Sequence, residues 1–461
     1  MAHRFFIETF GCQMNQHDSE KIAGLLAHQG MVAVSGPDEA DLLILNTCSV
    51  REKAVQKMYS RLGEFKARKR SDPDFLIGVV GCVAQQEGEA LVQKAPFVDL
   101  VVGTHMYHAI PDLLEQSRRG RGRVATRFEQ GPLPAEIAPV RRGNDFRANI
   151  TIMEGCNKRC AFCIVPFTRG RERNRPARSI LEEVSRAAQE GFVEVLLLGQ
   201  TVNSYKDPGN PRFKFAQLLA RLAEVRGLRR IRFTSPHPVE FCDETIAVID
   251  AHEVICNQVH LPLQSGSTAV LKRMRRQYTR DWFLTLVEKF RRGRRRIAFS
   301  TDVIVGFPGE SEQDFEQTLS LVRQVEFESM FSFKYSVRPQ TEAQPWKDDV
   351  PKDVKTRRLM LLQRLQKGIQ LDLHQRHYLG REAEVLVEGV ARDGRQRSGR
   401  TATGRIVNFP GNQSPGEFVK VQITRVGPNS LQGAALGEPS QTAAGMPIKE
   451  PEWNVNSESR V

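Results

Sequence analysis

Short apolar runs alternate with amphipathic stretches over the first 118 residues of the chain. Such runs predict buried strands, and stretches with apolar positions three or four apart predict helices between them. The predicted strands are Arg4–Glu8, Asp41–Leu45, Phe75–Val80 and Val98–Val102, and the predicted helices are Asp18–His28, Glu52–Lys69 and Gln85–Lys94. Because strands and helices alternate, we expect an α/β domain with a parallel sheet over residues 1–118.

The same alternation resumes with longer units over residues 144–377. The six predicted strands are Asn149–Met153, Glu194–Leu198, Arg230–Thr234, Asn257–Leu261, Ala298–Val305 and Met330–Tyr335, and Val354–His374 is predicted to form a closing helix. Ser179 and Ser311 offer capping signals for two of the intervening helices. Six βα units are fewer than the eight of a TIM barrel, so we expect a partial barrel of that type.

Three other segments have different patterns. Residues 378–440 alternate apolar and polar positions between glycine-rich turns, which predicts a small all-β, OB-like barrel of a kind that often binds oligonucleotides. Residues 119–143 are rich in Arg, Gly and Pro and are predicted to be a linker. Residues 441–461 are polar and are expected to be disordered.

Composition narrows the class of protein. The 461 residues are 40% apolar and 26% charged, which is typical of globular domains, and the net charge of +13 points to a polyanionic partner. The first ten residues contain no export signal, and the longest apolar stretch, Phe75 to Ala84, is too short for a membrane span. We therefore expect a cytoplasmic protein that has no membrane partner.

Three of the eight cysteines follow predicted strands of the first domain. Cys12, Cys48 and Cys82 lie just past the ends of its first three strands. In open α/β sheets that edge is where ligands bind, so we expect these three cysteines to converge on one site.

Three more cysteines form a C-x3-C-x2-C run after the first predicted barrel strand. Thiolates of Cys156, Cys160 and Cys163 can hold three irons of a 4Fe-4S cluster and leave the fourth iron open to S-adenosylmethionine. Phe162 is predicted to pack beside the adenine of that cofactor. A zinc site would require a fourth ligand, and neither Cys nor His follows within twenty residues of Cys163. A redox pair would use C-x2-C alone, and a core role does not suit a loop with Asn157, Lys158 and Arg159.

The run from Glu154 to Gly170, Glu-Gly-Cys-Asn-Lys-Arg-Cys-Ala-Phe-Cys-Ile-Val-Pro-Phe-Thr-Arg-Gly, resembles the radical S-adenosylmethionine methylthiotransferases. The resemblance extends over nearly the whole chain. It implies that Cys12, Cys48 and Cys82 hold an auxiliary 4Fe-4S cluster and that residues 381–436 form the RNA-binding TRAM barrel. Phe10-Gly-Cys-Gln-Met-Asn15 and Asn46-Thr-Cys-Ser-Val-Arg-Glu-Lys53 are most similar to the branch that acts on N6-dimethylallyladenosine beside the anticodon of tRNA.

The resemblance also implies a reaction with two molecules of S-adenosylmethionine. One methylates sulfur at the auxiliary cluster. The other is cleaved at the cluster of Cys156, Cys160 and Cys163, and its 5′-deoxyadenosyl radical removes the hydrogen from C2 of the adenine, which then takes the methylthio group. An electron-donor protein is required, and we expect a monomer. Gln200 follows Leu198-Gly199 where the wider superfamily often has Gly-Gly-Glu, and it is one candidate to hold the methionine amino group. Asp302–Glu310 is predicted to wall the cofactor pocket, or to be only a tight turn.

The remaining signals are less specific. We expect Cys242 and Cys256 to be buried inert thiols, and His237 and His260 either to line the pocket or to be structural. Residues 141–178 hold ten basic and three acidic side chains, and residues 272–296 hold eleven and two, which favours RNA over the alternative of solvated helix faces. Alternative functions are the same chemistry on threonylcarbamoyladenosine or a ribosomal-protein aspartate, and a non-catalytic RNA-binding protein with structural metal.

Overall fold

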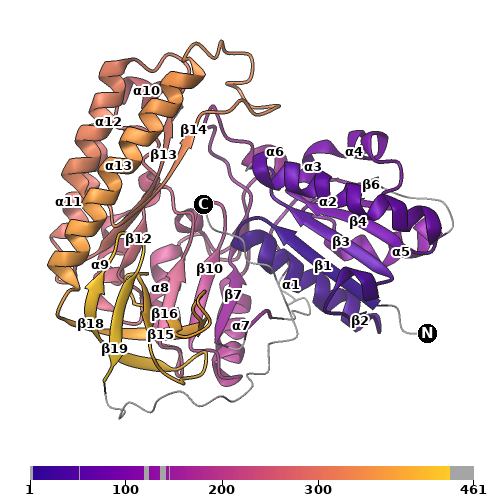
Figure 1. The fold of residues 1–461 in the computed structure, drawn as a ribbon, viewed down its shortest axis with the longest axis horizontal. Coiled ribbons are helices and arrows are strands. Elements are labelled where there is room, and N and C mark those ends of the chain that lie inside the picture. The colour runs from indigo at the N-terminus through magenta and orange to yellow at the C-terminus, as the bar shows by residue number, and fades with distance from the viewer. Residues whose placement is uncertain (1–3, 51, 119–123, 135–141, 145, 437–461) are drawn as a thin grey trace.

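A six-stranded parallel sheet forms the N-terminal part of the chain (Figure 1) in a computed structural model that describes residues 4–50, 52–118, 124–134, 142–144 and 146–436. The strands, in spatial order, are β2 (Val32–Ala33), β1 (Arg4–Phe10), β3 (Leu42–Thr47), β4 (Leu76–Gly81), β5 (Leu100–Val102) and β6 (Val124–Ala125). One face packs on α1 (Gln13–His28) and α5 (Ile110–Arg118), and the other packs on α2 (Glu52–Ser71), α3 (Cys82–Glu87) and α4 (Glu89–Lys94). Both faces are buried, which explains why most residues of the strands are apolar.

The edge strand β6 corrects the predicted linker. Val124 and Ala125 pair in parallel with Val101 and Val102, so this part of residues 119–143 belongs to the sheet. Two adjacent apolar residues can complete the edge of a buried sheet even when arginines surround them in sequence. Residues 119–123 and 135–141 of the predicted linker, and the predicted tail at 441–461, lie outside the described residues.

Six strands form the predicted partial barrel in the centre of the chain. They are β7 (Arg147–Thr151), β10 (Glu194–Leu198), β11 (Arg230–Phe233), β12 (Gln258–His260), β13 (Ala298–Val305) and β14 (Ser329–Lys334). They form two three-stranded parallel sheets, β11-β10-β7 and β12-β13-β14, joined by a bridge between Ile231 and Ile255. Within the described residues β7 and β14 each have one neighbour in the sheet, so the barrel is open between them.

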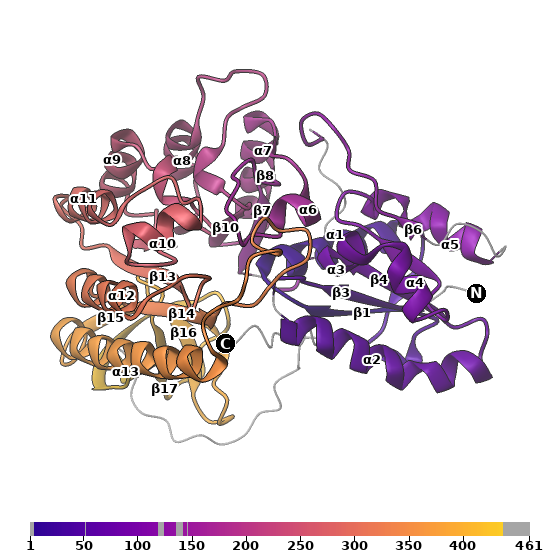
Figure 2. The ribbon, with the colours of Figure 1, turned by 90° about the horizontal axis from the view of Figure 1, so that it is seen from above.

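An outer arc of helices covers this sheet (Figure 2). The arc contains α7 (Ala177–Gln189), α8 (Phe215–Ala223), α9 (Asp243–Ala251), α11 (Arg280–Arg291) and α12 (Glu312–Val325), followed by the long helix α13 (Lys352–His377). Shorter elements occupy the connections: β8 (Met153–Glu154), β9 (Arg173–Asn174), α6 (Val165–Arg169) and α10 (Thr268–Arg273), with 3-10 helices η1 (Pro37–Glu39), η2 (Tyr107–Ala109), η3 (Val202–Ser204) and η4 (Pro238–Glu240). Among the helices of the described ranges, none is long and apolar enough to cross a membrane.

The two predicted capping serines behave differently. Ser311 caps α12 as expected: its hydroxyl accepts from the Asp314 N–H at 3.1 Å, and the Asp314 carboxylate accepts from the Ser311 N–H at 2.9 Å. The prediction for Ser179 is wrong, because α7 begins two residues earlier, after Pro176. The Ala177 N–H instead donates to Asp207 at 2.7 Å, which supplies the cap from a distant loop.

A closed five-stranded barrel forms the C-terminal part of the chain. Its strands, in spatial order, are β15 (Glu382–Val390), β16 (Arg397–Arg400), β17 (Ile406–Phe409), β19 (Leu431–Ala435) and β18 (Phe418–Val426). It packs against the amino-terminal ends of the central strands (Figure 1): Arg232, on β11, donates to the carbonyls of Thr401 and Ala402 at 2.7 and 3.1 Å. The opposite, carboxyl ends of the central strands remain available for a site.

A buried carboxylate joins the two barrels. Glu194, fully buried at the start of β10, forms ion pairs with Arg147 and with Arg232, the latter at 2.9 Å, and Arg147 also contacts Glu388 of β15. Burial opposes ionisation of Glu194, but Arg232 and Arg147 outweigh it and lower the pKa of its carboxyl to about 2. The stabilisation is therefore present above the ordinary pKa of 4.5 and is lost as the pH falls through about 2.

Replacing Glu194 by Gln is expected to lower the free energy of unfolding by about 3–5 kcal/mol at pH 7, because the buried Arg232 loses its counter-charge and Arg147 keeps only Glu388. Chemical denaturation would measure the change. The matched control is Glu182→Gln, which removes the acid of an exposed pair with Arg178 and should have little effect. If the two variants were equally stable, the role assigned to Glu194 would be wrong.

Candidate functional site

The first cysteine trio lies at the carboxyl ends of three adjacent strands. Cys12 follows β1 and caps α1, Cys48 follows β3, and Cys82 is the first residue of α3 after β4. The register places Phe10 beside Thr47 and Thr47 beside Gly81, and the Cys48 N–H donates to the Phe10 carbonyl at 2.8 Å. The three cysteines therefore gather at one sheet edge, as their positions in the sequence predict.

Two buried asparagines support this edge. The Asn15 amide donates to the Asn46 side-chain oxygen at 3.0 Å, and the Asn46 amide donates to the Asn15 carbonyl at 2.8 Å and to Ser19 at 2.9 Å. A Cβ at Gly81 would lie 2.4 Å from the Asn46 oxygen, and Gly81 has a φ of +90°, so only glycine fits there. These contacts fix the backbone on either side of the trio.

The thiols of the trio have unlike acidities. A hydrogen bond with Cys48 lowers the pKa of the Cys12 thiol to about 6 and raises the pKa of Cys48. Burial raises the pKa of Cys82, although the nearby Arg169 opposes that effect. Because thiolates are the metal-binding form of cysteine, loading of this site requires the protons of Cys48 and Cys82 to be released.

The second trio lies in the loop between β8 and α6, beside the carboxyl ends of the central strands. The Cys156 N–H donates to the Gly170 carbonyl at 3.1 Å, which folds the loop back on itself. Gly155 has a φ of +75°, and a Cβ there would lie 2.0 Å from the Arg171 carbonyl, so the tight approach requires glycine. The loop is thus held in shape independently of any bound group.

Polar side chains from other loops contact the thiols of the second trio. Arg276, buried in the segment after α10, donates to Cys160 Sγ at 3.3 Å, and the Thr201 hydroxyl lies 3.3 Å from Cys156 Sγ. Against a thiolate the hydroxyl must be the donor. Burial raises the pKa of Cys163 to about 12 and also raises that of Cys156.

The predicted cofactor residues lie around this loop. Phe162 packs edge-on against Phe307, with ring centroids 6.3 Å apart. The segment around Cys163 therefore contacts the turn that follows β13. Gln200 accepts a hydrogen bond from the Gly155 N–H at 2.5 Å, which places it next to the cysteine loop. The roles of Phe162 and Gln200 toward S-adenosylmethionine stay predictions.

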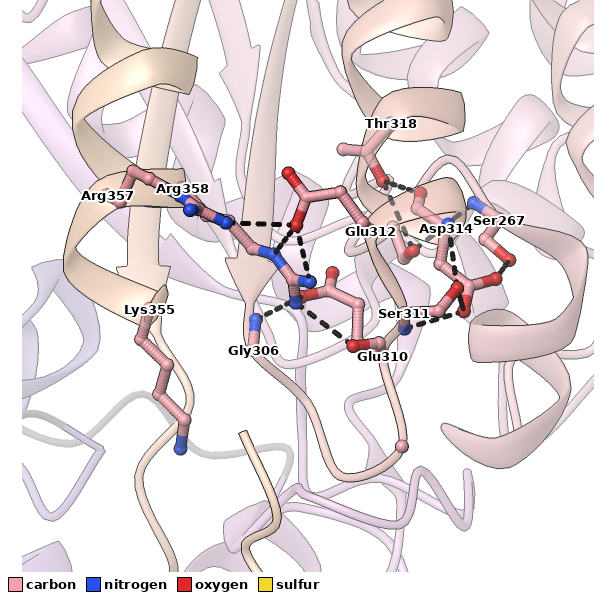
Figure 3. A network of polar contacts seen from close by, with 12 residues as sticks. Ser267, Gly306, Glu310, Ser311, Glu312, Asp314, Thr318, Lys355, Arg357 and Arg358 are labelled. Carbon is pink, nitrogen blue, oxygen red and sulfur yellow. Dashed lines mark hydrogen bonds and ion pairs between the residues drawn. The ribbon is translucent and has the colours of Figure 1, made fainter. Parts of the chain in front are cut away.

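The turn after β13 is anchored from α13. Glu310 accepts from the Gly306 N–H at 2.5 Å and from Arg358 at 2.9 Å, and a Cβ at Gly306 would lie 2.4 Å from the Lys355 side chain (Figure 3). Burial raises the pKa of Glu310, with Arg358 opposing. The long helix therefore fixes the turn that carries Phe307.

The inner face of the barrel carries polar and aromatic side chains. On β13, Phe299, Val303 and Val305 belong to the core shared with the outer helices, so Ser300, Asp302 and Ile304 face inward. His260 contacts Ser300 at 3.0 Å and Asp302 at 3.2 Å. Phe331 and Phe333 of β14 pair with Asp302 and Ile304, and they are 46% and 38% exposed. The inner face thus offers exposed aromatic surface next to a polar pair.

A buried polar seam joins the two cysteine sites. Arg169, at the end of α6, donates to Asp18 of α1 at 2.6 Å, and Tyr107 donates to the same carboxylate at 3.0 Å. The Thr104 hydroxyl donates to the Thr168 carbonyl at 2.8 Å, and His105 Nε2 contacts the Arg169 carbonyl at 2.9 Å. The helix that directly follows the second trio therefore packs beside the first trio.

Two of the less specific predictions are settled by burial. Cys256 is buried as expected, but Cys242 is exposed, because it caps α9 and its thiol points to the hydroxyl of Thr245 at 3.3 Å. His237 is structural: burial, then Arg276 and Lys158, lower its pKa to about 2, and its ring accepts from the Val239 N–H at 3.3 Å. His260 is the histidine that reaches the inner face.

The basic runs are only partly internal: Arg175 and Arg276 are buried, but Arg171, Lys272 and Arg292 are exposed, so their assignment as RNA-binding surface stays a prediction. In the first run Arg142 and Arg175 both pair with Glu183. In the second, Arg295 donates to three backbone carbonyls, and Arg296 pairs with Glu328. Arginine side chains used in this way hold loops together and are not free to bind phosphate.

The two trios fit iron-sulfur clusters by their donor chemistry. Each offers three sulfur ligands from a shaped backbone, and such clusters are held by cysteine thiolates. In the described part of the chain, no three His, Cys, Asp or Glu side chains are grouped closely enough to hold a single metal ion.

Several site residues were not identified from the sequence. Asn15, Asn46 and Arg169 all lie within the motif runs, so the motifs could have indicated them. Asp18 and Tyr107 carry no local signal, because their roles depend on a helix that is distant in sequence.

Comparisons with known proteins agree with this architecture. Residues 4–103 match Uncharacterized protein family UPF0004, residues 150–322 match the Radical SAM superfamily, and residues 376–436 match the TRAM domain. Among solved structures, the radical S-adenosylmethionine methyltransferase TsrM from Kitasatospora setae, with cobalamin and a 4Fe-4S cluster bound, has a TM-score of 0.55 at 15% identity and covers 75% of this chain and 77% of its own. At that identity the likeness concerns the fold alone.

Two relatives match along almost their whole length. The tRNA-2-methylthio-N(6)-dimethylallyladenosine synthase of Solibacter usitatus is 46% identical over 434 residues, which is 93% of this chain and 97% of the relative. The synthase of the same name from Geobacter sulfurreducens is 46% identical over 430 residues, or 93% and 96% of the two chains. The chain therefore belongs to the family of radical S-adenosylmethionine methylthiotransferases, together with the tRNA-2-methylthio-N(6)-dimethylallyladenosine synthases.

Proposed function

We propose that the protein converts N6-dimethylallyladenosine next to the anticodon of tRNA to its 2-methylthio derivative. The observation that carries the proposal is the buried ion pair between the two cysteine sites. Arg169, six residues after Cys163, meets Asp18, six residues after Cys12. Two sulfur-rich sites joined in this way suit a reaction that needs both, and the relatives of the same length supply the substrate.

Each trio is proposed to hold one 4Fe-4S cluster: Cys12, Cys48 and Cys82 the auxiliary one, and Cys156, Cys160 and Cys163 the one that binds S-adenosylmethionine. When bound, these groups supply the sulfur, its methyl group and the radical that removes hydrogen from C2 of the adenine. The chain's own contribution is to orient and charge-balance the thiolates. Arg276 and Thr201 donate to the second trio, and Arg169 lies beside the first.

The inner face of the barrel is the proposed place of the substrate base. Phe331 and Phe333 offer partly exposed rings for an unstacked adenine and its dimethylallyl group, because proteins bind splayed-out RNA bases on aromatic side chains. The His260–Asp302 pair lies beside them and can hydrogen-bond polar edges of the base. Phe162 approaches from the cysteine loop.

The TRAM barrel lies at the other end of the central strands from the cysteine loop (Figure 1). β13 has eight residues, so it spans about 26 Å at roughly 3.3 Å per residue. We propose that the TRAM barrel holds the body of the tRNA while the anticodon loop reaches the inner face. A monomeric protein in the cytoplasm, supplied by an electron-donor protein, would be sufficient for this arrangement.

Nucleoside analysis tests the proposed reaction. Purified protein with both clusters, S-adenosylmethionine and a reductant is expected to convert tRNA that carries N6-dimethylallyladenosine. Digestion and mass spectrometry should show the base gaining one methylthio group in place of a hydrogen. The matched control is the same tRNA without the dimethylallyl group. Loss of that group is expected to cost at least 1.4 kcal/mol of binding free energy, so the control should be converted at least about tenfold more slowly.

The alternative substrates define the opposing results. Conversion of threonylcarbamoyladenosine or of a ribosomal-protein aspartate, with dimethylallyladenosine left unmodified, would overturn the proposal. A protein that binds tRNA but contains zinc and no acid-labile sulfide would instead be the non-catalytic RNA-binding protein.

A further inference from the structure

We propose that Arg169 is a positioning residue of the auxiliary site and donates a hydrogen bond to its anionic sulfur. The inference rests on the proposed ligand set of Cys12, Cys48 and Cys82. In this proposal, the domain that binds S-adenosylmethionine contributes a side chain directly to the auxiliary site. Arg169 is delivered by α6, which begins two residues after Cys163.

The position of the guanidinium is tightly determined. The side chain of Arg169 is 3% exposed, and that of Asp18 is fully buried. Arg169 Nη2 donates to Asp18 Oδ2 at 2.6 Å, and Tyr107 holds the same oxygen at 3.0 Å. The helix that carries Arg169, α6, packs directly against α3, whose first residue is Cys82.

One donor of this guanidinium has no partner in the described protein. Arg169 Nη1 is buried and has no hydrogen-bond partner among the described residues, and neither has Asp18 Oδ1, the second oxygen of the carboxylate it pairs with. A buried donor without an acceptor is costly, so native sites rarely retain one. An acceptor that completes the auxiliary site would remove that cost. The anionic sulfur of the Cys82 thiolate, of a cluster sulfide or of the sulfur to be transferred has the required chemistry.

Docking of the two domains does not by itself require this side chain. The backbone of the same helix end is already held across the seam by Thr104 and His105. Lys21 of α1 lies 3.6 Å from Glu154, which precedes the second trio. These contacts hold the two domains together without the Arg169 guanidinium.

The expected consequence is a change in reduction potential. A hydrogen bond to cluster sulfur and a nearby positive charge both stabilise the more negative, reduced state, so they raise the potential. Asp18 complicates a single substitution, because Arg169→Met leaves its charge uncompensated. The double variant Arg169→Met/Asp18→Asn keeps the local formal charge of the pair at zero while it removes the donor, and Asp18→Asn alone gives the effect of losing the carboxylate.

The experiment uses the full chain with Cys156, Cys160 and Cys163 replaced by Ala, so that only the auxiliary cluster remains. Its potential is measured by redox titration followed by electron paramagnetic resonance. We expect Asp18→Asn to shift the potential upward and the Arg169→Met/Asp18→Asn variant to shift it below that of the parent. The control Arg171→Met removes an exposed charge from the same loop and should cause no shift.

Each outcome decides the matter. A double variant with the parental potential would overturn the proposal and leave Arg169 a partner of Asp18 only. Loss of auxiliary iron would support a positioning role if the iron-free forms of parent and variant have the same Tm, whereas a lower Tm of the iron-free variant would show a purely structural role. A parent protein without iron would instead overturn the ligand assignment, which keeps the two failures distinct.

Discussion

Replacing Cys156, Cys160 and Cys163 together by alanine is expected to abolish both formation of 5′-deoxyadenosine and methylthiolation of tRNA. The three thiols come from one loop whose backbone is fixed by Gly155 and by the Cys156–Gly170 hydrogen bond. No other Cys lies within this loop. The substitution therefore removes the three ligands but leaves the backbone of the loop in place. The iron content should fall from about eight to about four atoms per chain.

Liquid chromatography of the reaction mixture measures 5′-deoxyadenosine, and metal analysis measures iron. Cys242→Ala is the matched control, because Cys242 is an exposed cysteine that belongs to neither trio, and it should retain full activity and iron. Production of 5′-deoxyadenosine by the triple variant above the level without protein would contradict the assignment. Thermal unfolding should be compared in the same preparations, since loss of a cluster also removes its contribution to stability.

The local frame of both sites could be predicted from the sequence because it depends on short-range patterns. Each trio follows the end of an apolar strand, and strand ends in a parallel sheet share an edge. Gly-Cys pairs at residues 11–12, 81–82 and 155–156 mark the points where the chain turns sharply into the site. The six strands of the partial barrel follow from the same alternation of strand and helix.

Long-range partners could not be predicted in this way. Asp18 and Arg169 are 151 positions apart, and neither the charge nor the spacing of either residue indicates the other. The arginine runs show the same limit. Their composition indicates a charged surface but not which side chains have protein partners: Arg295 donates to backbone carbonyls, and Arg296 pairs with Glu328. Cys242 has a buried neighbour, Phe241, yet its own side chain points outward because it begins a helix.

Replacing Cys12, Cys48 and Cys82 by alanine is expected to give the complementary result. Formation of 5′-deoxyadenosine should continue, while methylthiolation should fall below detection, because the second trio and the face that carries Phe162 and Phe307 remain intact. The two sites share the seam of Arg169 and Asp18 but no cysteine, so each can be emptied separately.

The fold should tolerate these substitutions better than it would tolerate the loss of Asn46. That side chain holds Asn15 and Ser19 whether or not the thiols are present. Measuring 5′-deoxyadenosine and modified nucleoside in one reaction separates radical formation from sulfur insertion, and Cys242→Ala again serves as the control. Continued methylthiolation by the triple variant would show that the sulfur comes from elsewhere. Loss of both products, with parent and variant having the same Tm once both are freed of iron, would show instead that the auxiliary site is needed to shape the S-adenosylmethionine site across the seam.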